Sequence, residues 1–313
     1  MSISKRSSAA AATAKAARSE ASAAKPANRC TPDRRRFALT GPSRALDHRQ
    51  HAARRDLADI DLAGRWFAPH YAIPETQSCG FAGADILASP SATAPRISQL
   101  LPGEAFAVLE ASGGWAWGYG LHDRYVGYVW ADALGAPVEP THLVEARAAL
   151  LFAEPSSRAA VRAVLPIGAR LAGQAEGDFL ETADGFVPRQ QLRPIECLTD
   201  DPVEVAEQLI GMPYLWGGRG IGGIDCSGLV QLAFGLAGVS VPRDSDQQAA
   251  AGRAAAANAR RGDLLFFPDH VALLAGPDTV VHASGHWMEV RIESLADLVA
   301  RLGTPIARRR VLP

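Results

Sequence analysis

The sequence has few cysteines and no long apolar run, and these two shortages exclude several kinds of protein. Its 313 residues include four cysteines, Cys30, Cys79, Cys197 and Cys226, too few to hold so long a chain together as a disulfide scaffold. None of the cysteines are close enough in sequence to form a zinc knuckle. No apolar stretch approaches the roughly 20 residues that cross a bilayer. We therefore expect a protein of a reducing compartment, the cytoplasm, without a membrane partner.

The net charge of −1 hides a strong asymmetry. Residues 1–55 carry thirteen Lys and Arg against three Asp and Glu (net +10), and the remainder carries nineteen against thirty (net −11). The basic segment is rich in Ala and Ser, which predicts a disordered basic tail over 1–55. Its best apolar run, Ala9–Ala12, is shorter than a signal-peptide core of 7–15 residues, so we expect no export. The Arg34-Arg35-Arg36 run is interpreted as solvated rather than as a nucleic-acid site.

Short strands separated by glycine turns dominate the next part of the chain. Runs at 105–109, 115–118 and 125–129 are apolar and aromatic between glycines, which is typical of a small barrel. The pattern recurs faintly, because Leu101-Pro102-Gly103 is echoed at 165–168 and Gly127-Tyr128-Val129 at 185–187. The offsets of 64 and 58 residues fit a repeated module of about 60 residues. Both copies, over 56–136 and 137–197, resemble bacterial SH3-type barrels.

From residue 198 to 313 the pattern becomes mixed. Asp201 and Pro202 open a helix that Gly211 ends, and a second helix starts after Asp225. Strands are expected at 264–267, 270–275, 279–284 and 288–292. Helices followed by an antiparallel sheet predict an α+β domain at the C-terminus.

Cys226 is the strongest candidate for chemistry. It follows Asp225, the expected N-cap, so it lies in the first turn of a helix, where partial positive charge favours a thiolate. A lone cysteine is more often an inert buried residue, and this one needs a base. If residues 276–278 form a three-residue hairpin turn, Ala272 lies opposite His282, and His270 and His282 share one face as diagonal neighbours. A thiol, a base and an orienting residue are the components of nucleophilic acyl transfer.

Metal binding by His270, His282 and His286 is the competing use of the same residues. Only Asp269 and Glu289 accompany them near ligand spacing, so we expect no metal site and no cofactor.

The motifs of the C-terminal part resemble those of the NlpC family of papain-like cysteine peptidases, which cut bacterial murein peptides. The resemblance rests on six motifs in the family's order over residues 200–292: Tyr214-Leu215-Trp216-Gly217-Gly218, Asp225-Cys226-Ser227-Gly228, Pro242-Arg243-Asp244-Ser245, Arg261-Gly262-Asp263-Leu264, His270-Val271 and His282-Ala283. With two bacterial SH3 (SH3b) modules in front, the whole chain is similar to γ-D-glutamyl-L-diamino-acid endopeptidases.

The resemblance implies a role for each matching residue. Cys226 would be the nucleophile, His270 the general base and acid, and His282 the orienting member. Tyr214 would lie beside the oxyanion, while Asp225 and Ser227 would hold the free α-amino group of an N-terminal L-Ala. Packing for Tyr214 and helix capping for Asp225 and Ser227 are the structural alternatives. A tyrosine of the first SH3b module closes the cleft in such enzymes, and Tyr125 is the nearest match.

The resulting hypothesis is a cytoplasmic cysteine endopeptidase that cleaves the γ-D-Glu–diamino-acid bond of free murein peptides during recycling. The alternatives are a secreted hydrolase of intact murein, a non-catalytic SH3b protein that binds wall peptides, and an acyltransferase or amidase of the same superfamily. The expected partner is the murein-derived peptide, with no obligate protein partner and no nucleic acid. Whether the diamino acid is diaminopimelate or lysine stays open.

Overall fold

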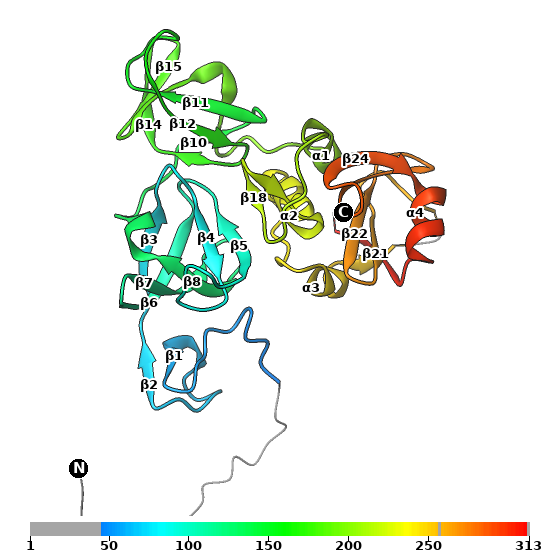
Figure 1. Cartoon of the computed structure of the whole chain (residues 1–313), viewed down its shortest axis with the longest axis horizontal. Coiled ribbons are helices and arrows are strands. Elements are labelled where there is room, and N and C mark those ends of the chain that lie inside the picture. Colours follow the sequence, from blue (N-terminus) through cyan, green and yellow to red (C-terminus); the bar gives the residue numbers. More distant parts are fainter. Residues whose placement is uncertain (1–44, 256–257, 312–313) are drawn as a thin grey trace, which may run out of the picture. The chain divides into compact units, whose positions relative to one another are not determined.

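The computed structural model describes residues 45–255 and 258–311, which belong to one compact unit (Figure 1). The Arg34-Arg35-Arg36 run and most of the predicted tail lie outside the described residues. The end of that tail, residues 45–55, is part of the folded unit, because Ala52 is fully buried in an apolar cluster with Trp117. The predicted boundary at residue 55 is therefore wrong. Among the described residues, no helix combines the length and the apolar character needed to span a membrane.

The first barrel is an antiparallel sheet of seven strands in the order β5-β4-β8-β7-β6-β3-β9. Its strands are β3 (Glu75–Cys79), β4 (Ala84–Leu87), β5 (Arg96–Leu100), β6 (Ala105–Ser112), β7 (Trp115–Gly120), β8 (Val126–Trp130) and β9 (Leu134–Gly135). The predicted aromatic and apolar runs are the strands β6 to β8. Ahead of the barrel, β1 (Leu57–Asp59) and β2 (His70–Ala72) form a parallel pair.

Strand β7 is buried along its whole length, on both faces of the sheet. Ala116 packs into the barrel core, whereas Trp117 and Tyr119 on the other face pack against Ala52, Leu57 and Ala72. Successive side chains of a strand point to opposite faces, so the segment before the barrel is what covers the second face. Trp115, which stacks on Trp130, and Trp117 are therefore packing residues.

The second barrel repeats the first in topology. Its strands are β10 (His142–Val144), β11 (Ala148–Phe152), β12 (Val161–Pro166), β13 (Arg170–Leu171), β14 (Gly173–Glu176), β15 (Phe179–Thr182), β16 (Gly185–Pro188) and β17 (Leu192–Pro194). They form the orders β12-β11-β16-β15-β14 and β13-β10-β17. This is the order of the first barrel, except that two short strands, β13 and β14, take the place of β6. The two echoed glycines, Gly103 and Gly168, both have positive φ, 74° and 83°. The repeat read from the sequence is confirmed.

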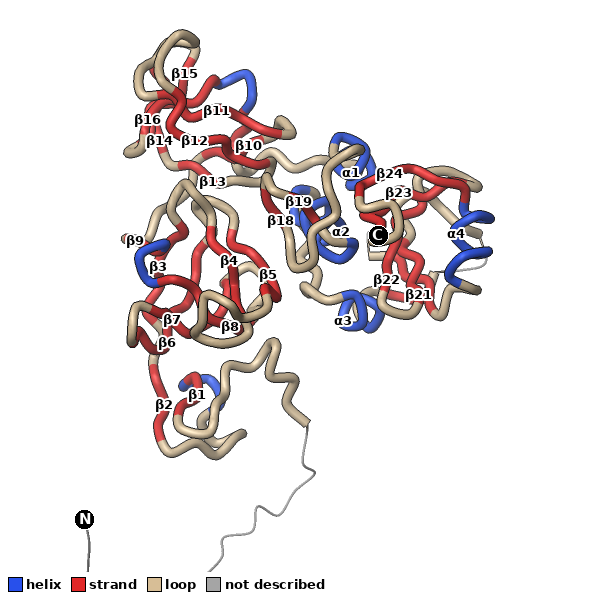
Figure 2. Tube along the Cα trace, viewed as in Figure 1, coloured by secondary structure: helices blue, strands red, loops and turns tan. Residues whose placement is uncertain are grey.

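The C-terminal part is an α+β domain, and it holds the α-helices of the described chain (Figure 2). The helices are α1 (Pro202–Gln208), α2 (Cys226–Leu236), α3 (Ser245–Ala250) and α4 (Leu295–Leu302). The short pair β18 (Arg219–Gly220) and β19 (Gly223–Ile224) precedes α2. The main sheet has the order β20-β25-β21-β22-β23-β24, with β20 (Arg253–Ala254), β21 (Leu264–Phe267), β22 (His270–Leu274), β23 (Thr279–Ser284), β24 (Glu289–Ser294) and β25 (Ala307–Arg310).

Most of these elements were expected from the sequence. Asp201 caps α1 by accepting the N–H of Val203, and strands β21 to β24 lie within a residue or two of their predicted bounds. Helix α2 is apolar on nearly all sides and is buried between the sheet and α1, with Leu229, Val230 and Val271 in one core cluster. A helix that is hydrophobic all round is typical of a buried position. The sequence did not indicate α3, α4, β20 or β25.

A buried ion pair joins the first barrel to the peptidase-like domain. The Arg219 guanidinium donates to both carboxylate oxygens of Glu104, at 2.8 and 3.0 Å. Both side chains are at most 4% exposed. Arg219 also donates to the backbone carbonyl of Gln99. Bidentate, desolvated contacts of this kind fix geometry, because neither charge has water to replace its partner.

Replacing Glu104 with Gln should destabilise the folded unit, because the Arg219 charge would stay buried without its carboxylate. Removing one partner of a buried pair costs roughly 3–5 kcal/mol, and urea unfolding followed by tryptophan fluorescence measures this loss. Glu207→Gln is the matched control. Its pair with Arg261 is about a third exposed on each side, so the cost should not exceed about 1 kcal/mol. Equal losses for the two variants would contradict the importance of the buried pair.

The same variant should change the response to acid. Burial acts to raise the pKa of Glu104, but the charges of Arg219 and His122 lower it more, to about 2 from the ordinary 4.5. A carboxylate with a lowered folded pKa contributes stability that is complete above its unfolded pKa and is lost as the pH falls. This contribution therefore disappears between about pH 5 and pH 2, and it should be absent from Glu104→Gln.

Candidate active site

The N-terminus of α2 places Cys226 at the edge of a cavity. Asp225 caps the helix by accepting the N–H of Gly228 at 2.7 Å, so Cys226 is the first helical residue, as the sequence predicted. Gly228 is required there because a Cβ at this position would lie 2.6 Å from the carbonyl oxygen of Gly218. The start of the helix therefore packs closely against residues 217–218, and this contact fixes the position of Cys226.

The two histidines lie together on the hairpin β22–β23. Leu273 pairs with Val281 and Leu274 with Val280, which is the register that sets Ala272 opposite His282. His270 Nε2 lies 2.8 Å from His282 Nδ1, and the two rings are nearly perpendicular, at 81°. The predicted register and the shared face are confirmed.

The thiol lies against the strand that carries His270. The backbone N–H of Val271, the next residue, is directed at the sulfur of Cys226, as is the N–H of Ser227. The structure thus brings His270 and His282 into direct contact, and it brings Cys226 to the adjoining backbone.

The prediction of a resting thiolate is not supported by this environment. Burial and, to a smaller extent, the negative charge of Asp225 raise the pKa of the Cys226 thiol to about 11. The N–H groups of Val271 and Ser227 and the charge of Arg243 lower it by less. Burial also lowers the pKa of His270 to about 3. Because desolvation disfavours whichever form is charged, thiol and imidazole are both neutral at pH 7.

Arg243 is the buried cationic partner of Asp225 and Ser227. Its guanidinium donates to both carboxylate oxygens of Asp225, at 2.9 and 2.7 Å, and to Ser227 Oγ at 2.9 Å. Asp225 also accepts the N–H of Gly217 at 2.8 Å. The side chain of Arg243 is 1% exposed. Asp225 and Ser227 line the cavity beside Cys226 as well as binding Arg243. Their role at a substrate amine stays a prediction.

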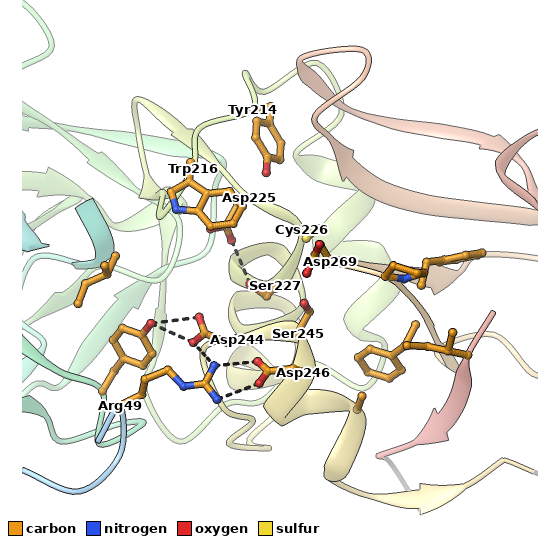
Figure 3. Close-up of a pocket in the computed structure, with 17 residues that line it drawn as sticks. Arg49, Tyr214, Trp216, Asp225, Cys226, Ser227, Asp244, Ser245, Asp246 and Asp269 are labelled. Carbon is orange, nitrogen blue, oxygen red and sulfur yellow. Dashed lines mark hydrogen bonds and ion pairs between the residues drawn. The ribbon is translucent and has the colours of Figure 1, made fainter. Parts of the chain in front are cut away.

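A cavity of about 590 Å³ opens over Cys226 (Figure 3). Tyr214 points toward the cysteine from one side, and Trp216, 67% exposed, lies near it. Burial raises the pKa of Tyr214 to about 12, so its hydroxyl is a neutral donor. Tyr125 lines the same cavity, as predicted for a tyrosine of the first barrel. It follows Arg124, whose φ of 60° marks a tight, strained turn.

Asp244 is the functional candidate that sequence reasoning missed. Its carboxylate accepts the Tyr125 hydroxyl at 3.0 and 3.1 Å and Arg49 at 2.8 Å. It stands at the N-cap of α3 without capping that helix, and it faces the cavity instead (Figure 3). Burial raises its pKa in spite of Tyr125, Arg243 and Arg49. The Pro242-Arg243-Asp244-Ser245 motif held the signal, but the sequence assigned these residues no role.

Arg49 was also missed, and no local pattern could have identified it. Its guanidinium contacts the carboxylates of Asp244 and Asp246 at 2.8–2.9 Å (Figure 3). It also contacts Asp47, beside it in the chain. The segment that the sequence assigned to a disordered tail thus contributes to the wall of the cavity.

No group of three or more His, Cys, Asp or Glu side chains in the described part of the chain is arranged to hold a metal ion. The chemistry available here is that of a thiol at a helix N-terminus, an imidazole pair and neutral donors around one cavity. A fold in which a helix carries the thiol and an antiparallel sheet carries the base is that of papain-like thiol–imidazole domains.

Comparison with known proteins agrees with this class. Residues 211–301 match the NlpC/P60 family, and residues 86–134 match the bacterial dipeptidyl-peptidase SH3 domain. The chain therefore carries an NlpC/P60 domain behind an SH3 domain of that type. A crystal structure of an NlpC/P60 family protein from Bacillus cereus has the same fold over 76% of this chain and all of its own, with a TM-score of 0.67 and 21% identity.

The names of two curated relatives state an enzymatic activity. Dipeptidyl-peptidase 6 of Lysinibacillus sphaericus is 42% identical over 98 residues, 31% of this chain and 36% of that protein. The γ-D-glutamyl-L-lysine dipeptidyl-peptidase of Bacillus subtilis is 31% identical over 130 residues, 39% of this chain and 43% of that protein. The matches thus span less than half the length of either relative.

We expect the imidazoles of His270 and His282 to stay neutral in the folded chain down to about pH 5. Burial is the main cause, and it lowers the pKa of His270 to about 3 and of His282 to about 4. Histidine NMR, assigned with His270→Ala and His282→Ala, measures the two titrations. The urea-denatured chain, with histidines near 6.5, is the reference. A folded midpoint for His270 at or above 6.5 would contradict the neutral pair.

The two lowered pKa values make the stability of the folded chain depend on pH. Between pH 6.5 and about pH 4 the unfolded chain binds protons at these two positions and the folded chain does not. Stability from the two buried imidazoles is therefore complete above about pH 6.5 and declines as the pH falls.

Proposed function

We propose that this protein is a cysteine endopeptidase that cleaves the γ-D-Glu–diamino-acid bond of free murein peptides with an unblocked N-terminal L-Ala. One observation carries the proposal. The cavity over Cys226 is bounded by Tyr125 of the SH3 barrel, and the Tyr125 hydroxyl is hydrogen-bonded to the partly buried carboxylate of Asp244. The name of the Bacillus subtilis relative, a γ-D-glutamyl-L-lysine dipeptidyl-peptidase, supports this bond. Action in the cytoplasm during peptide recycling is part of the proposal.

The neutral thiol and imidazole define how the first step proceeds. The proton of Cys226 moves to His270 as the sulfur forms its bond to the γ-carbonyl carbon of D-Glu. The N–H at the start of α2 then donates to the oxyanion. His270 returns the proton to the leaving amine of the diamino acid as the C–N bond breaks. Water hydrolyses the thioester and releases L-Ala-γ-D-Glu.

Asp244 is the carboxylate that best fits the α-amino group of L-Ala. Its raised pKa shows that burial outweighs the partners it already has, so a protonated amine beside it would relieve the desolvation of its charge. Tyr125 of the first barrel and Arg49 of the segment before it both hold Asp244. An acyl group on the amine would remove the cation and would have to fit between these side chains.

The amine requirement predicts a selective enzyme. Full-length protein should hydrolyse the free tripeptide L-Ala-γ-D-Glu-L-Lys or its diaminopimelate form, and acetylation of L-Ala should lower kcat/KM by about 5- to 150-fold or more. A buried charge left without its partner costs roughly 1–3 kcal/mol, and steric exclusion adds to this. Intact sacculi, whose L-Ala is amide-linked, should be spared.

Asp244→Asn tests the residue assignment in the same assay. The variant should lose about 10- to 100-fold in kcat/KM on the free tripeptide and much less on the acetylated one, so that the preference collapses. Asp278→Asn, in the hairpin turn outside the cavity, is the control and should keep the preference. Equal rates of the wild-type enzyme on the two peptides, or hydrolysis of sacculi alone, would refute the proposal and favour a wall hydrolase.

A further inference from the structure

The carboxylate of Glu293 lies behind the two histidines, on the side away from the thiol. His282 pairs with Arg291 across β23 and β24, and Glu293 is two residues further along β24, on the same face. Glu293 Oε1 is 2.9 Å from His282 Nε2, although the N–H bond meets it obliquely. Both side chains are at most 8% exposed, so no water replaces this contact cheaply.

Two further groups hold Glu293 in place. Arg301 of α4 donates to Glu293 Oε1, and the indole N–H of Trp287 donates to Oε2 at 3.4 Å. The carboxylate is therefore ionised, because the hydrogen bond from Arg301 lowers its pKa against the effect of burial. An ionised carboxylate has no proton and can only accept.

This restriction decides where the protons of both rings lie. Facing an acceptor, His282 carries its hydrogen on Nε2, and a neutral imidazole then has a bare Nδ1. Because that bare Nδ1 is 2.8 Å from His270 Nε2, His270 must donate from Nε2. Its own Nδ1 is left without a hydrogen. That nitrogen is the only ring atom of His270 able to take the proton of a thiol.

The opposite tautomers would block the reaction. With its hydrogen on Nδ1, His282 would donate to His270 Nε2, and His270 would carry its hydrogen on Nδ1. The bare nitrogens would then be the Nε2 atoms of both rings. His270 Nδ1 would carry a hydrogen and could not accept the proton of Cys226. Nothing in the two imidazoles themselves selects one arrangement, so a third group has to do so.

The charges around His282 let Glu293 orient the ring without protonating it. The groups that face it are Glu293 and Arg291 on β24, Arg301 on α4 and His270 on β22. Burial lowers the pKa of His282, Glu293 raises it, and Arg301 and Arg291 lower it, with a net value of about 4. The ring is thus a neutral relay member at pH 7.

We propose that Glu293 is a positioning residue that selects the tautomers of His282 and His270, and so keeps His270 competent as a base. During the reaction the proton of Cys226 moves to His270 Nδ1, while the hydrogens on the Nε2 atoms of both rings stay where they are. The kinetic consequence rests on the proposed peptidase activity, whereas the tautomers themselves do not.

Nitrogen-15 NMR of histidine-labelled wild-type protein at pH 7 tests the tautomers without any substrate. Both rings should show a protonated Nε2 and a bare Nδ1. A wild-type His282 with its hydrogen on Nδ1 would overturn the proposal, even if the enzyme proved to cleave the tripeptide. Failure of the tripeptide assay with the expected tautomers would instead count against the proposed function alone.

Variants of Glu293 test the consequence. Glu293→Ala should lower kcat about 10- to 100-fold with KM changed less than about threefold, and its histidines should show mixed tautomers. Glu293→Gln keeps an acceptor oxygen and should recover most of the loss. Glu289→Ala, a partly exposed carboxylate on the same strand, is the control and should match wild type. Unchanged kcat in folded Glu293→Ala, or in Glu293→Gln with scrambled tautomers, would overturn the proposal.

Discussion

The buried pair of Arg243 and Asp225 is the contact on which the site depends. Asp225 caps the helix that carries Cys226 and accepts the N–H of Gly217, so one carboxylate fixes the nucleophile and the loop beside it. Arg243 compensates that charge in a site without water and donates from Nε to Ser98 Oγ of the first barrel. A buried charge that loses its partner is strongly destabilising. The Arg243–Asp225 pair therefore holds α2, the loop at Gly217 and the first barrel in one arrangement.

Burial also keeps the thiol and the imidazoles of this site uncharged before the reaction. The thiol and both imidazoles are neutral at pH 7 because each would lose hydration by charging, and Asp225 is neutralised by Arg243. Asp244, Asp246 and Asp269 are the other carboxylates that line the cavity, and Asp244 is held by Tyr125 and Arg49. A bound peptide would place its ammonium group at Asp244 and its carbonyl at Cys226. The thiol and the imidazole would then become charged only during the reaction.

Local patterns predicted the parts that depend on neighbours in sequence. The cap at Asp225, the turn at 276–278 and the alternation along β22 and β23 were enough to place Cys226 at a helix start and the two histidines on one face. The partners of Arg243 and Asp244 could not be predicted, because Ser98 and Arg49 are far away in the chain. The resting thiol escaped prediction for a related reason: helix position favours the thiolate, but burial, which only the folded chain reveals, outweighs it. The contact of Glu293 with His282 likewise required the register of a third strand.

Trapping the acyl-enzyme tests most directly that Cys226 is the nucleophile of a γ-D-glutamyl transfer to water. Full-length protein is mixed with L-Ala-γ-D-Glu-L-Lys, quenched in acid at early times, digested and analysed by mass spectrometry. The predicted result is a Cys226 peptide heavier by L-Ala-γ-D-Glu less one water, absent from Cys226→Ala and from reactions with the N-acetylated tripeptide. Hydrolysis of the tripeptide by Cys226→Ala at the wild-type rate, or the same adduct on another cysteine of the active enzyme, would contradict it.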